Sequence, residues 1–296
     1  MTPDLVRGHR RRDRDLVIVV ASRIVDRPDN TDDGLRSPDG PSPDRELDDA
    51  ALSSVRSLDR PFVILGVLRE HRSPMRLTEI ATASQLHLAT TQRIINLLIR
   101  YGYVEREGFE YRLGVVSLLN GNVYLLSNRL TQVAESVLHE LTSSTGLTST
   151  LSVRYHHSSV LLLRVSSVPP LRFQLQVGEQ MPLVVGGARV LAAAMSSDEM
   201  DQLLEGVHSI SLASGVVLDR EEFIASLEVI RQRGYAFGQS QREAGALSIA
   251  VPVVDRRESV VASLQLSAMI EDIPVDVDAL VMELKRASAA VSRRIP

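Results

Sequence analysis

The stretch LTEIATASQLHLATTQRIINLLIRYGYVEREGFEYRLG (residues 77–114) decides the architecture of the first part of this 296-residue chain. Apolar residues at helical spacing predict a short amphipathic helix over 77–86 and a longer helix from Ala89, separated by a tight turn. A hairpin of two short strands around Gly108 follows. The order helix, turn, helix, hairpin is that of a winged helix-turn-helix, which leaves the polar face of the second helix free for the major groove of DNA.

The residues immediately before this stretch complete the predicted helical unit. SLDRPFVILGVLREH (57–71) has apolar residues at helical spacing and predicts a further helix, which Ser73-Pro74 ends. Asp59 is its predicted N-cap, because Pro61 then falls in the first turn, where a missing N–H is harmless. Thr78 is the predicted cap of the short helix, and the hairpin strands are expected at 103–106 and 110–113.

The longer helix has two distinct faces. Its apolar face is expected to hold Ile94, Ile95, Leu98 and Tyr101. Its polar face is expected to hold Ala89, Gln92, Arg93, Asn96 and Arg100. A polar helix face at this spacing is commonly a solvated surface. The helix alone therefore favours neither a solvated face nor a face that binds DNA. The winged order around the helix favours DNA reading.

Composition and charge narrow the class of protein. The formal net charge is −4, and it divides into −3 for residues 1–50, +3 for 52–114 and −4 for 115–296, so only the helix-turn-helix part is basic. There is no cysteine, which excludes disulfides, thiolate metal sites and thiol catalysis. No apolar run approaches the roughly 20 residues that a membrane span needs. We therefore expect a cytoplasmic protein without membrane contact.

The pattern along the chain predicts four segments. Residues 1–50 are rich in Asp, Pro and Gly and are expected to be a disordered extension. The winged helix-turn-helix occupies 51–114, a linker helix for dimerisation 115–128, and an effector-binding domain 129–296. The linker belongs to a helical pattern over 115–145 that Gly146 closes as a C-cap. Its apolar residues indicate a dimer interface, with an internal core as the alternative; they are Leu118, Leu119, Val123, Leu125, Leu126, Leu130 and Val133.

Short strands and helices alternate beyond Gly146. This order predicts an α/β (α+β) domain with a mostly antiparallel sheet. The predicted strands cover 147–155, 159–167, 171–178, 247–255 and 259–269, and the predicted helices cover 188–195, 219–234 and 277–295. His156-His157 is interpreted as a hairpin turn rather than a metal site, because no further ligand stands at suitable spacing. No nucleophile elbow or phosphate loop stands out, so we predict no enzymatic activity, no cofactor and no metal.

Four stretches resemble the IclR family of bacterial transcriptional regulators. Besides residues 77–114 they are SLDRPFVIL, LRFQLQVGEQMPL and IRQRGYAFGQSQREAGALSIAVPVVDRRESVVASLQLSA. The resemblance implies a DNA-binding winged helix, a dimerising linker helix and a GAF-like domain that binds a small effector. It also implies a homodimer or tetramer on a palindromic double-stranded operator, with repression favoured over activation. The second hypothesis is a GAF-like ligand-binding or enzymatic protein whose winged helix mediates protein contacts.

The resemblance also assigns DNA-contacting residues. They are Thr90, Gln92, Arg93 and Asn96 on the helix and Arg106 and Arg112 on the wing. Arginine can donate two hydrogen bonds to guanine, and glutamine or asparagine can pair with adenine. The family commonly has Pro, a basic residue and Ser where this chain has His87, Leu88 and Ala89. A cap and a phosphate contact are therefore missing, for which Arg72 or Arg76 is expected to compensate.

The same resemblance assigns an effector site. Its residues are Phe173, Met181, Gly186, Gly187, Gly238, Ala246, Ser248, Gln265 and Ser267. Gly186 and Gly187 precede a helix, so their N–H groups could receive a carboxylate, although from the glycines alone a tight turn is favoured. Val184, Val185, Gly238 and Gln265 replace residues that are usually His, Thr or Ser, an acid and Ser. We therefore predict a larger or more apolar ligand, such as an aromatic acid; a protein that binds no ligand is the alternative.

Overall fold

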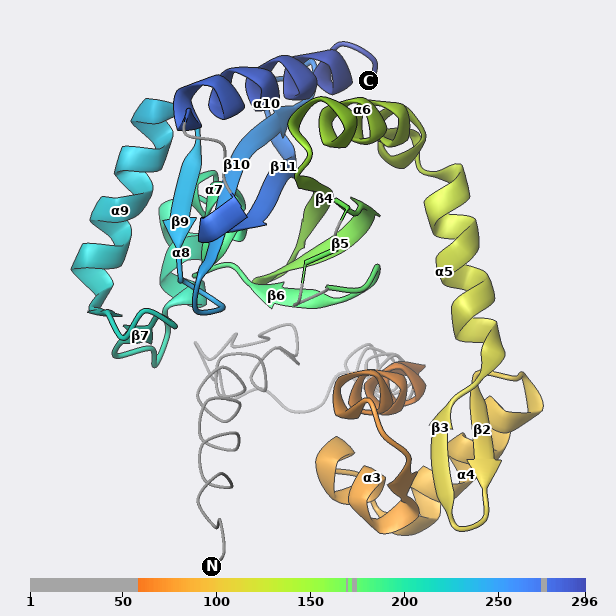
Figure 1. Cartoon of the computed structure of the whole chain (residues 1–296). Helices are drawn as coiled ribbons and strands as arrows, with labels where there is room; N and C mark the ends of the chain where they lie inside the picture. The colour runs from red at the N-terminus through yellow and green to blue at the C-terminus, as the bar shows by residue number, and fades with distance from the viewer. Residues whose placement is uncertain (1–57, 169, 172–174, 273–275) are drawn as a thin grey trace, which may run out of the picture. The chain divides into compact units, whose positions relative to one another are not determined.

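The computed structural model describes residues 58–168, 170–171, 175–272 and 276–296 (Figure 1). The segment predicted to be a disordered extension, 1–50, lies outside the described residues. The described chain divides into two compact units between Tyr124 and Leu125. Among the helices of the described part, none is long and apolar enough to cross a membrane.

The first unit is a winged helix-turn-helix, as predicted. A helix over residues 58–71 precedes the pair of helices that forms the motif. The further elements are β1 (Met75–Arg76), α3 (Leu77–Ser84), α4 (Leu88–Arg100), β2 (Val104–Glu107), β3 (Glu110–Leu113) and the start of α5 (Val115–Ser127). The wing is a three-stranded antiparallel sheet in the order β1-β3-β2, in which the unpredicted strand β1 pairs Met75 with Tyr111.

Both predicted helix caps in this unit are wrong. The first described helix already contains Asp59, so this residue is inside the helix and is not its N-cap. Helix α3 begins after Arg76, whose backbone N–H donates to Glu79 Oε2 at 2.7 Å. A glutamate at the third helical position can reach back to the residue before the helix in this way, so Arg76 takes the place that was predicted for Thr78.

The core of the first unit takes one isoleucine from each of its three helices. Ile64, Ile80 and Ile95 are fully buried against Val104 and Tyr111 of the wing and other apolar residues. The apolar face of α4 departs from the prediction at its end, because Tyr101 is 62% exposed as the residue after the last helical turn. Thr91 is fully buried instead, four residues before Ile95 on the same face.

The second unit is built on an antiparallel sheet, as predicted. The sheet has six strands, in the order β6-β5-β4-β11-β10-β9. Its strands are β4 (Thr148–Tyr155), β5 (Ser158–Val165), β6 (Gln180–Pro182), β9 (Ala236–Gln239), β10 (Ala246–Val254) and β11 (Val260–Met269). Two short strands, β7 (Ile210–Ser211) and β8 (Val217–Leu218), pair separately. Its helices are α6 (Arg129–Thr145), η1 (Gly186–Ala188), α7 (Arg189–Ala193), α8 (Ser197–Leu203), α9 (Arg220–Arg233), η2 (Ile270–Asp272) and α10 (Val277–Ser292).

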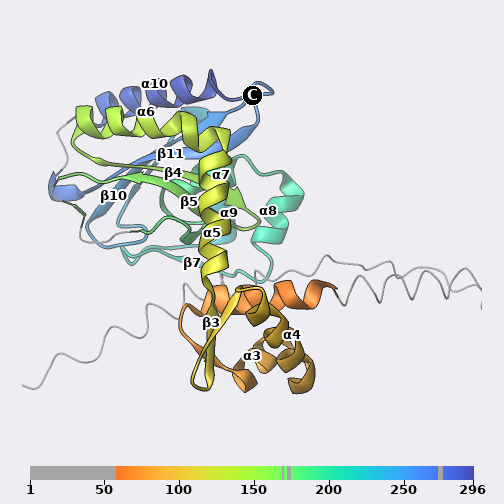
Figure 2. The same ribbon diagram turned by 90° about the vertical axis from the view of Figure 1, so that its right-hand side faces the viewer.

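Two layers of helices enclose this sheet. Helices α6 and α10 lie side by side across one face, and α7, α8 and α9 lie on the other side near β9 and β10 (Figures 1 and 2). The layers have separate apolar clusters, one centred on Leu138, Leu264 and Leu284 and the other on Phe223 and Leu227. The part of the sheet that α7, α8 and α9 leave uncovered carries the polar cavity described below.

Three local predictions are settled in this unit. The helical pattern over 115–145 breaks at Asn128, whose extended backbone ends α5 and whose Oδ1 accepts the Leu130 N–H at 2.9 Å as the cap of α6. Gly146 ends α6 with φ 71°, as predicted. No strand runs through the described residues of 171–178, because a turn at Gly178 (φ 85°) intervenes and pairing begins only at β6.

Candidate DNA-binding and effector sites

Helix α4 presents the predicted polar face. Arg93 and Asn96 are exposed, and Thr90 and Gln92 are half-buried. Gln92 Nε2 donates to Asn96 Oδ1 at 3.0 Å, one turn further along the helix. This contact orients both amides, leaving the Gln92 carbonyl as an acceptor and the Asn96 amide N–H groups as donors. The face therefore offers a guanidinium beside an ordered amide pair, groups that suit the edges of bases.

The start of α4 has no side-chain cap. His87 is its N-cap residue and its side chain accepts no backbone hydrogen bond, so the predicted loss of a cap is confirmed. The carbonyl of His87 is engaged, since it accepts the backbone N–H groups of Thr90 and Thr91 and the Thr91 hydroxyl. Among the described residues, the first-turn N–H groups of Leu88 and Ala89 have no hydrogen-bond partner, and they lie at the end of the helix that carries the partial positive charge.

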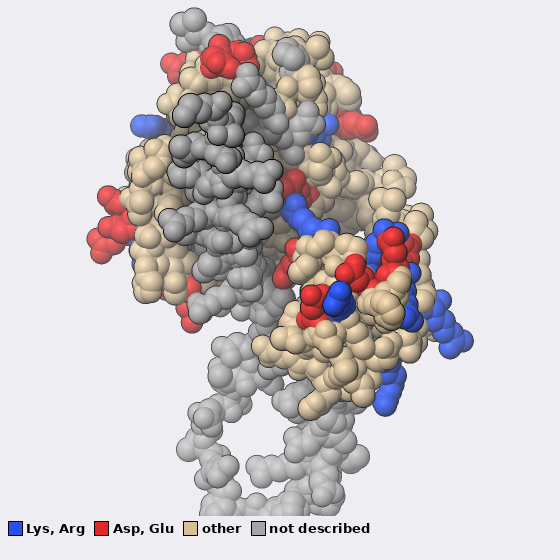
Figure 3. Space-filling model, turned by 60° about the horizontal axis from the view of Figure 1, so that its bottom comes forward, with Lys and Arg blue, Asp and Glu red and all other residues tan. Residues whose placement is uncertain are grey.

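The two wing arginines are engaged with groups of the wing itself. Arg112 lies 3.3 Å from Glu105 Oε2 and 3.4 Å from Glu107 Oε2. Arg106 Nε donates to the Gly108 carbonyl at 2.8 Å, and its guanidinium lies over the Tyr111 ring. On the face that Figure 3 presents, acidic side chains lie among the basic ones of the first unit, at the lower right of the view. Of the predicted phosphate contacts, Arg112 is therefore already neutralised by neighbouring carboxylates.

Removing one of these carboxylates should strengthen DNA binding. Glu107 is well exposed on the wing and makes one of the two ion pairs of Arg112, so Glu107→Gln leaves Arg112 with Glu105 alone and removes a charge that repels phosphate. We expect affinity for operator DNA to rise by about threefold at low salt and the gain to fade as salt is added. A binding titration at several salt concentrations measures this. Glu135→Gln makes the same change at an exposed position of α6. It is the control and should leave the affinity for DNA unchanged.

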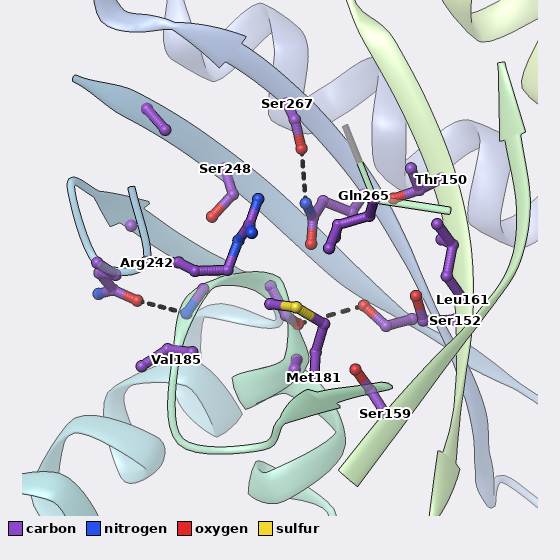
Figure 4. A pocket seen from close by; sticks show the side chains of 18 of the residues that line it. Thr150, Ser152, Ser159, Leu161, Met181, Val185, Arg242, Ser248, Gln265 and Ser267 are labelled. Atoms are coloured by element: carbon purple, nitrogen blue, oxygen red, sulfur yellow. Dashed lines mark hydrogen bonds between the residues drawn. The ribbon is translucent and has the colours of Figure 1, made fainter. Parts of the chain in front are cut away.

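A cavity on the uncovered face of the six-stranded sheet brings the predicted effector residues together (Figure 4). The space between its walls is about 800 Å³, a figure that includes the open solvent at its mouth. Every described residue of the predicted set lines it, namely Met181, Gly186, Gly187, Gly238, Ala246, Ser248, Gln265 and Ser267. Phe173 lies outside the described residues. Loop residues Leu171 and Leu175 complete an apolar wall with Met181 and Val185.

Strand register explains how the floor of the cavity becomes polar. Side chains at alternate positions of a strand share a face, and directly paired residues of neighbouring strands stand side by side on it. Three such rows cross the floor: Ser248, Ser267 and Thr148; then Ala250, Gln265, Thr150 and Arg164; then Pro252, Ser263, Ser152 and Leu161. The central row thus places Thr150 between Gln265 and Arg164, and hydroxyl-bearing residues of the other two rows lie on both sides of it.

The floor is more polar than the sequence indicated. Hydroxyl groups line the cavity from four strands, at Thr148, Thr150, Ser152, Ser159, Ser248, Ser263 and Ser267. The prediction of a more apolar ligand considered only the positions that the resemblance marks, and these are part of the lining. Most of the additional groups come from β4 and β5. The alternating polar residues of TSTLS (148–152) are the sequence signal that could have revealed them.

The glycines at one end of the cavity leave room for glutamine side chains that pack closely against the backbone. Gly186 has φ 59°, and its N–H donates to Gln241 Oε1 at 2.8 Å. The side chain of Gln241 occupies the space beside Gly238, where an added Cβ would lie 2.7 Å from it. An added Cβ at Gly187 would lie 1.9 Å from Gln265 Oε1. The tight-turn interpretation of Gly186 is therefore confirmed, and a carboxylate at its N–H would have to displace Gln241.

Two arginines that sequence reasoning missed line the cavity. Burial lowers the pKa of Arg242, against the carboxylates of Glu243 and Glu179, which raise it. Burial also lowers the pKa of Arg164, and no carboxylate opposes that shift. Both side chains remain charged at neutral pH, because the ordinary pKa of arginine is so high. Arg242 extends from the loop before β10 into the space between Ser248 and Met181 (Figure 4).

Comparison with known proteins identifies both domains. Residues 57–108 match the model of the IclR helix-turn-helix domain, and residues 122–293 match that of the bacterial transcriptional regulator IclR C-terminal domain, which alone covers more than half of the chain. The chain belongs to the IclR family. The resemblance seen in the sequence is confirmed, and the protein is a transcriptional regulator with a DNA-binding helix-turn-helix and an effector domain rather than an enzyme.

Individual relatives span most of both sequences. The HTH-type transcriptional regulator KdgR of Escherichia coli is 30% identical over 74% of this chain and 84% of its own length. The transcriptional repressor IclR of the same organism is 24% identical over 76% of this chain and 84% of its own length. An IclR transcriptional regulator from Alicyclobacillus acidocaldarius has the same fold, with a TM-score of 0.69, 24% identity and coverage of 81% of this chain and 99% of that one.

Proposed function

We propose that this IclR-family regulator represses a small catabolic or metabolic operon in the cytoplasm by binding a palindromic operator as a homodimer or a pair of dimers. A small organic effector binds in the cavity of the second unit and changes how much of the operator the regulator occupies. The observation that carries the proposal is the exposed face of α4, where Arg93 stands beside the ordered Gln92–Asn96 pair. Repression is favoured because a relative that spans most of the chain is named a transcriptional repressor.

Sequence-specific binding is the property to test first. Footprinting of the purified protein on the DNA that flanks its own gene should reveal a protected palindrome whose half-sites are about one helical turn apart or a multiple of that. A reporter fused to that promoter should rise when the gene is deleted. If no site is protected and the full-length chain instead binds another protein through α4, the alternative in which the winged helix mediates protein contacts is favoured.

Dimerisation is supported by the exposed apolar face of α5. Leu118, Leu119, Val123 and Leu126 fall on one side of this helix and are all exposed in the single chain, Leu118 by 71%. No residue of α5 is fully buried, but Val133 of α6 belongs to the core of the second unit, and Leu125 and Leu130 pack against that core. The internal core that the sequence left open as an alternative therefore takes these three residues of the predicted set, and the other four remain exposed. An exposed apolar stripe of this length is typical of a surface that another chain covers.

A charge placed in this stripe should separate the subunits. We expect Leu118→Glu to shift the protein from dimer to monomer at micromolar concentration, because a desolvated carboxylate would face apolar side chains. Light scattering coupled to size-exclusion chromatography measures the mass. Ala225→Glu adds the same charge to an exposed position of α9 and serves as the control. A dimeric Leu118→Glu protein would contradict assembly through α5.

A further inference from the structure

The hydroxyl groups on the floor of the cavity fall into two sets. Three are engaged with the protein itself: Thr148 with Ser167 at 3.0 Å, Ser263 with the Gly187 carbonyl at 3.3 Å, and Ser267 with Gln265 Nε2 at 2.6 Å. Among the described residues, no hydrogen-bond partner exists for the other four, Thr150, Ser152, Ser159 and Ser248. Their hydroxyls face the cavity (Figure 4) and can each donate and accept.

Among the described residues, Arg164 is the arginine of the cavity that has no carboxylate partner. Its Nη1 donates to the Leu175 carbonyl at 2.9 Å, but its buried Nη2 has no hydrogen-bond partner within the described ranges of the chain. Arg242 differs, because Glu179 and Glu243 lie close enough to favour its charged form. A buried guanidinium is best satisfied by a carboxylate, which can accept two parallel hydrogen bonds. The two glutamates near Arg242 disfavour a second negative charge on the same ligand.

The positions of these groups indicate the length and the polarity of a ligand that would fit the cavity. Thr150 is paired directly with Arg164, and Ser159 and Ser152 lie further along the same two strands, β5 and β4. Neighbouring strands are about 4.8 Å apart and alternate residues of one strand about 7 Å, so these groups lie within the reach of one short chain molecule. The opposite wall is apolar, formed by Leu171, Leu175 and Met181. The cavity therefore matches a chain with a carboxylate at one end, hydroxyls toward the floor and C–H groups toward the wall.

We propose that the effector is a straight-chain polyhydroxylated carboxylic acid, with its carboxylate on Arg164 and its hydroxyls on Thr150, Ser152 and Ser159. This inference rests on the proposed function and names the ligand class of the same site. It replaces the apolar or aromatic acid expected from the sequence. A bare hydrocarbon chain or ring would cover these hydroxyls with carbon and leave them without partners, which costs affinity at each one.

The test compares matched small molecules on the full-length protein. The probes are the aldonic acids of four, five and six carbons, the six-carbon polyol D-glucitol without a carboxylate, hexanoate without hydroxyls, and 4-hydroxybenzoate. We expect at least one aldonic acid to raise the unfolding midpoint by mass action, and the other three probes to bind at least about tenfold more weakly by calorimetry. The same aldonic acid should change operator occupancy in a gel-shift assay.

Variants then locate the carboxylate and the hydroxyls. Arg164→Met should weaken aldonic acid binding by about 100-fold, and Thr150→Val, which keeps the side-chain shape, by about tenfold. Arg220→Met is the matched control, because Arg220 lies on α9 outside the cavity and pairs with Asp201. Thr150→Val keeps the test decisive if Arg164→Met fails to fold.

Three results would overturn the proposal. They are binding of hexanoate or 4-hydroxybenzoate as tight as that of the aldonic acids, aldonic acid binding that survives Arg164→Met, and no binding of any probe. None of these three results tests DNA binding. The footprint of the ligand-free protein tests DNA binding separately. A protected operator without aldonic acid binding would therefore reject the ligand class and retain the regulator.

Discussion

Gly114→Ala is expected to unfold the junction between the wing and α5 and to abolish DNA binding. A Cβ at this position would lie 2.2 Å from the carbonyl oxygen of Gly102 and 3.1 Å from the carbonyl carbon of Tyr103. Both are backbone atoms and cannot rotate away. The backbone is also fixed there, because the Gly114 N–H donates to the Tyr103 carbonyl at 2.7 Å and the Val116 N–H donates to that of Gly102. We expect the first unit to lose about 2–4 kcal/mol of stability.

The matched control for this substitution lies on the helix that Gly114 precedes. Gly121 is inside α5, and an added Cβ would meet nothing within 4 Å. Alanine is the better helix former, so Gly121→Ala should be neutral or stabilising by up to about 1 kcal/mol. Thermal unfolding followed by circular dichroism compares the two variants. Equal midpoints for wild type and Gly114→Ala would show that the wing and α5 are not held together through these backbone contacts.

Most of the first unit was predictable because its signals are local. Helical spacing, Ser73-Pro74 and the turn at Gly108 each act within a few residues, and they place the helices and the hairpin to within a residue or two. Strand β1 was not predictable in this way. It consists of Met75 and Arg76 alone and exists only because it pairs with β3, more than thirty residues later. The cap of α3 was missed because Glu79 reaches back to Arg76, outside the expected helix.

The second unit shows which predictions depend on tertiary structure. The alternating residues of β10 and β11 identify strands, and their antiparallel pairing follows from the turn between them. The segment 171–178 also alternates, yet Gly178 forms a turn whose N–H donates to the Leu161 carbonyl, and the neighbouring strand pairs with β6 instead. Local alternation is thus insufficient where the chain must turn back over the sheet.

The effector site was predictable in part. The resemblance placed eight described residues on the cavity, but it did not mark Arg164 or the hydroxyls of β4. Alternating polar residues in a strand usually face solvent. Whether the polar face of TSTLS (148–152) meets water or a covered cavity depends on the loop at Leu171 and Leu175 and on η1, which are distant in sequence. This is why the polar lining of the cavity follows from the structure and not from the motif.

Arg93→Ala should abolish specific operator binding while leaving the fold intact. Arg93 is exposed on α4, and its side chain makes no hydrogen bond or ion pair with the described residues, in contrast to Arg112 on the wing. Bidentate pairing of an arginine with guanine is worth about 1–3 kcal/mol per site. A dimer loses this contact in both half-sites, so we expect affinity for the operator to fall by about 100-fold or more, with no change in the unfolding midpoint.

Two further variants separate reading of a base from contact with phosphate. Arg93→Lys keeps the charge and loses the fork geometry, so it should bind the operator nearly as poorly as Arg93→Ala while retaining nonspecific affinity. Arg100→Ala removes the same charge from α4 about two turns further on, roughly 10 Å along the helix axis, and should reduce specific and nonspecific binding alike by a few-fold. Gel shifts on operator and scrambled DNA at fixed salt measure both. If Arg93→Lys restores full operator affinity, Arg93 holds a phosphate, and sequence recognition falls to the Gln92–Asn96 pair.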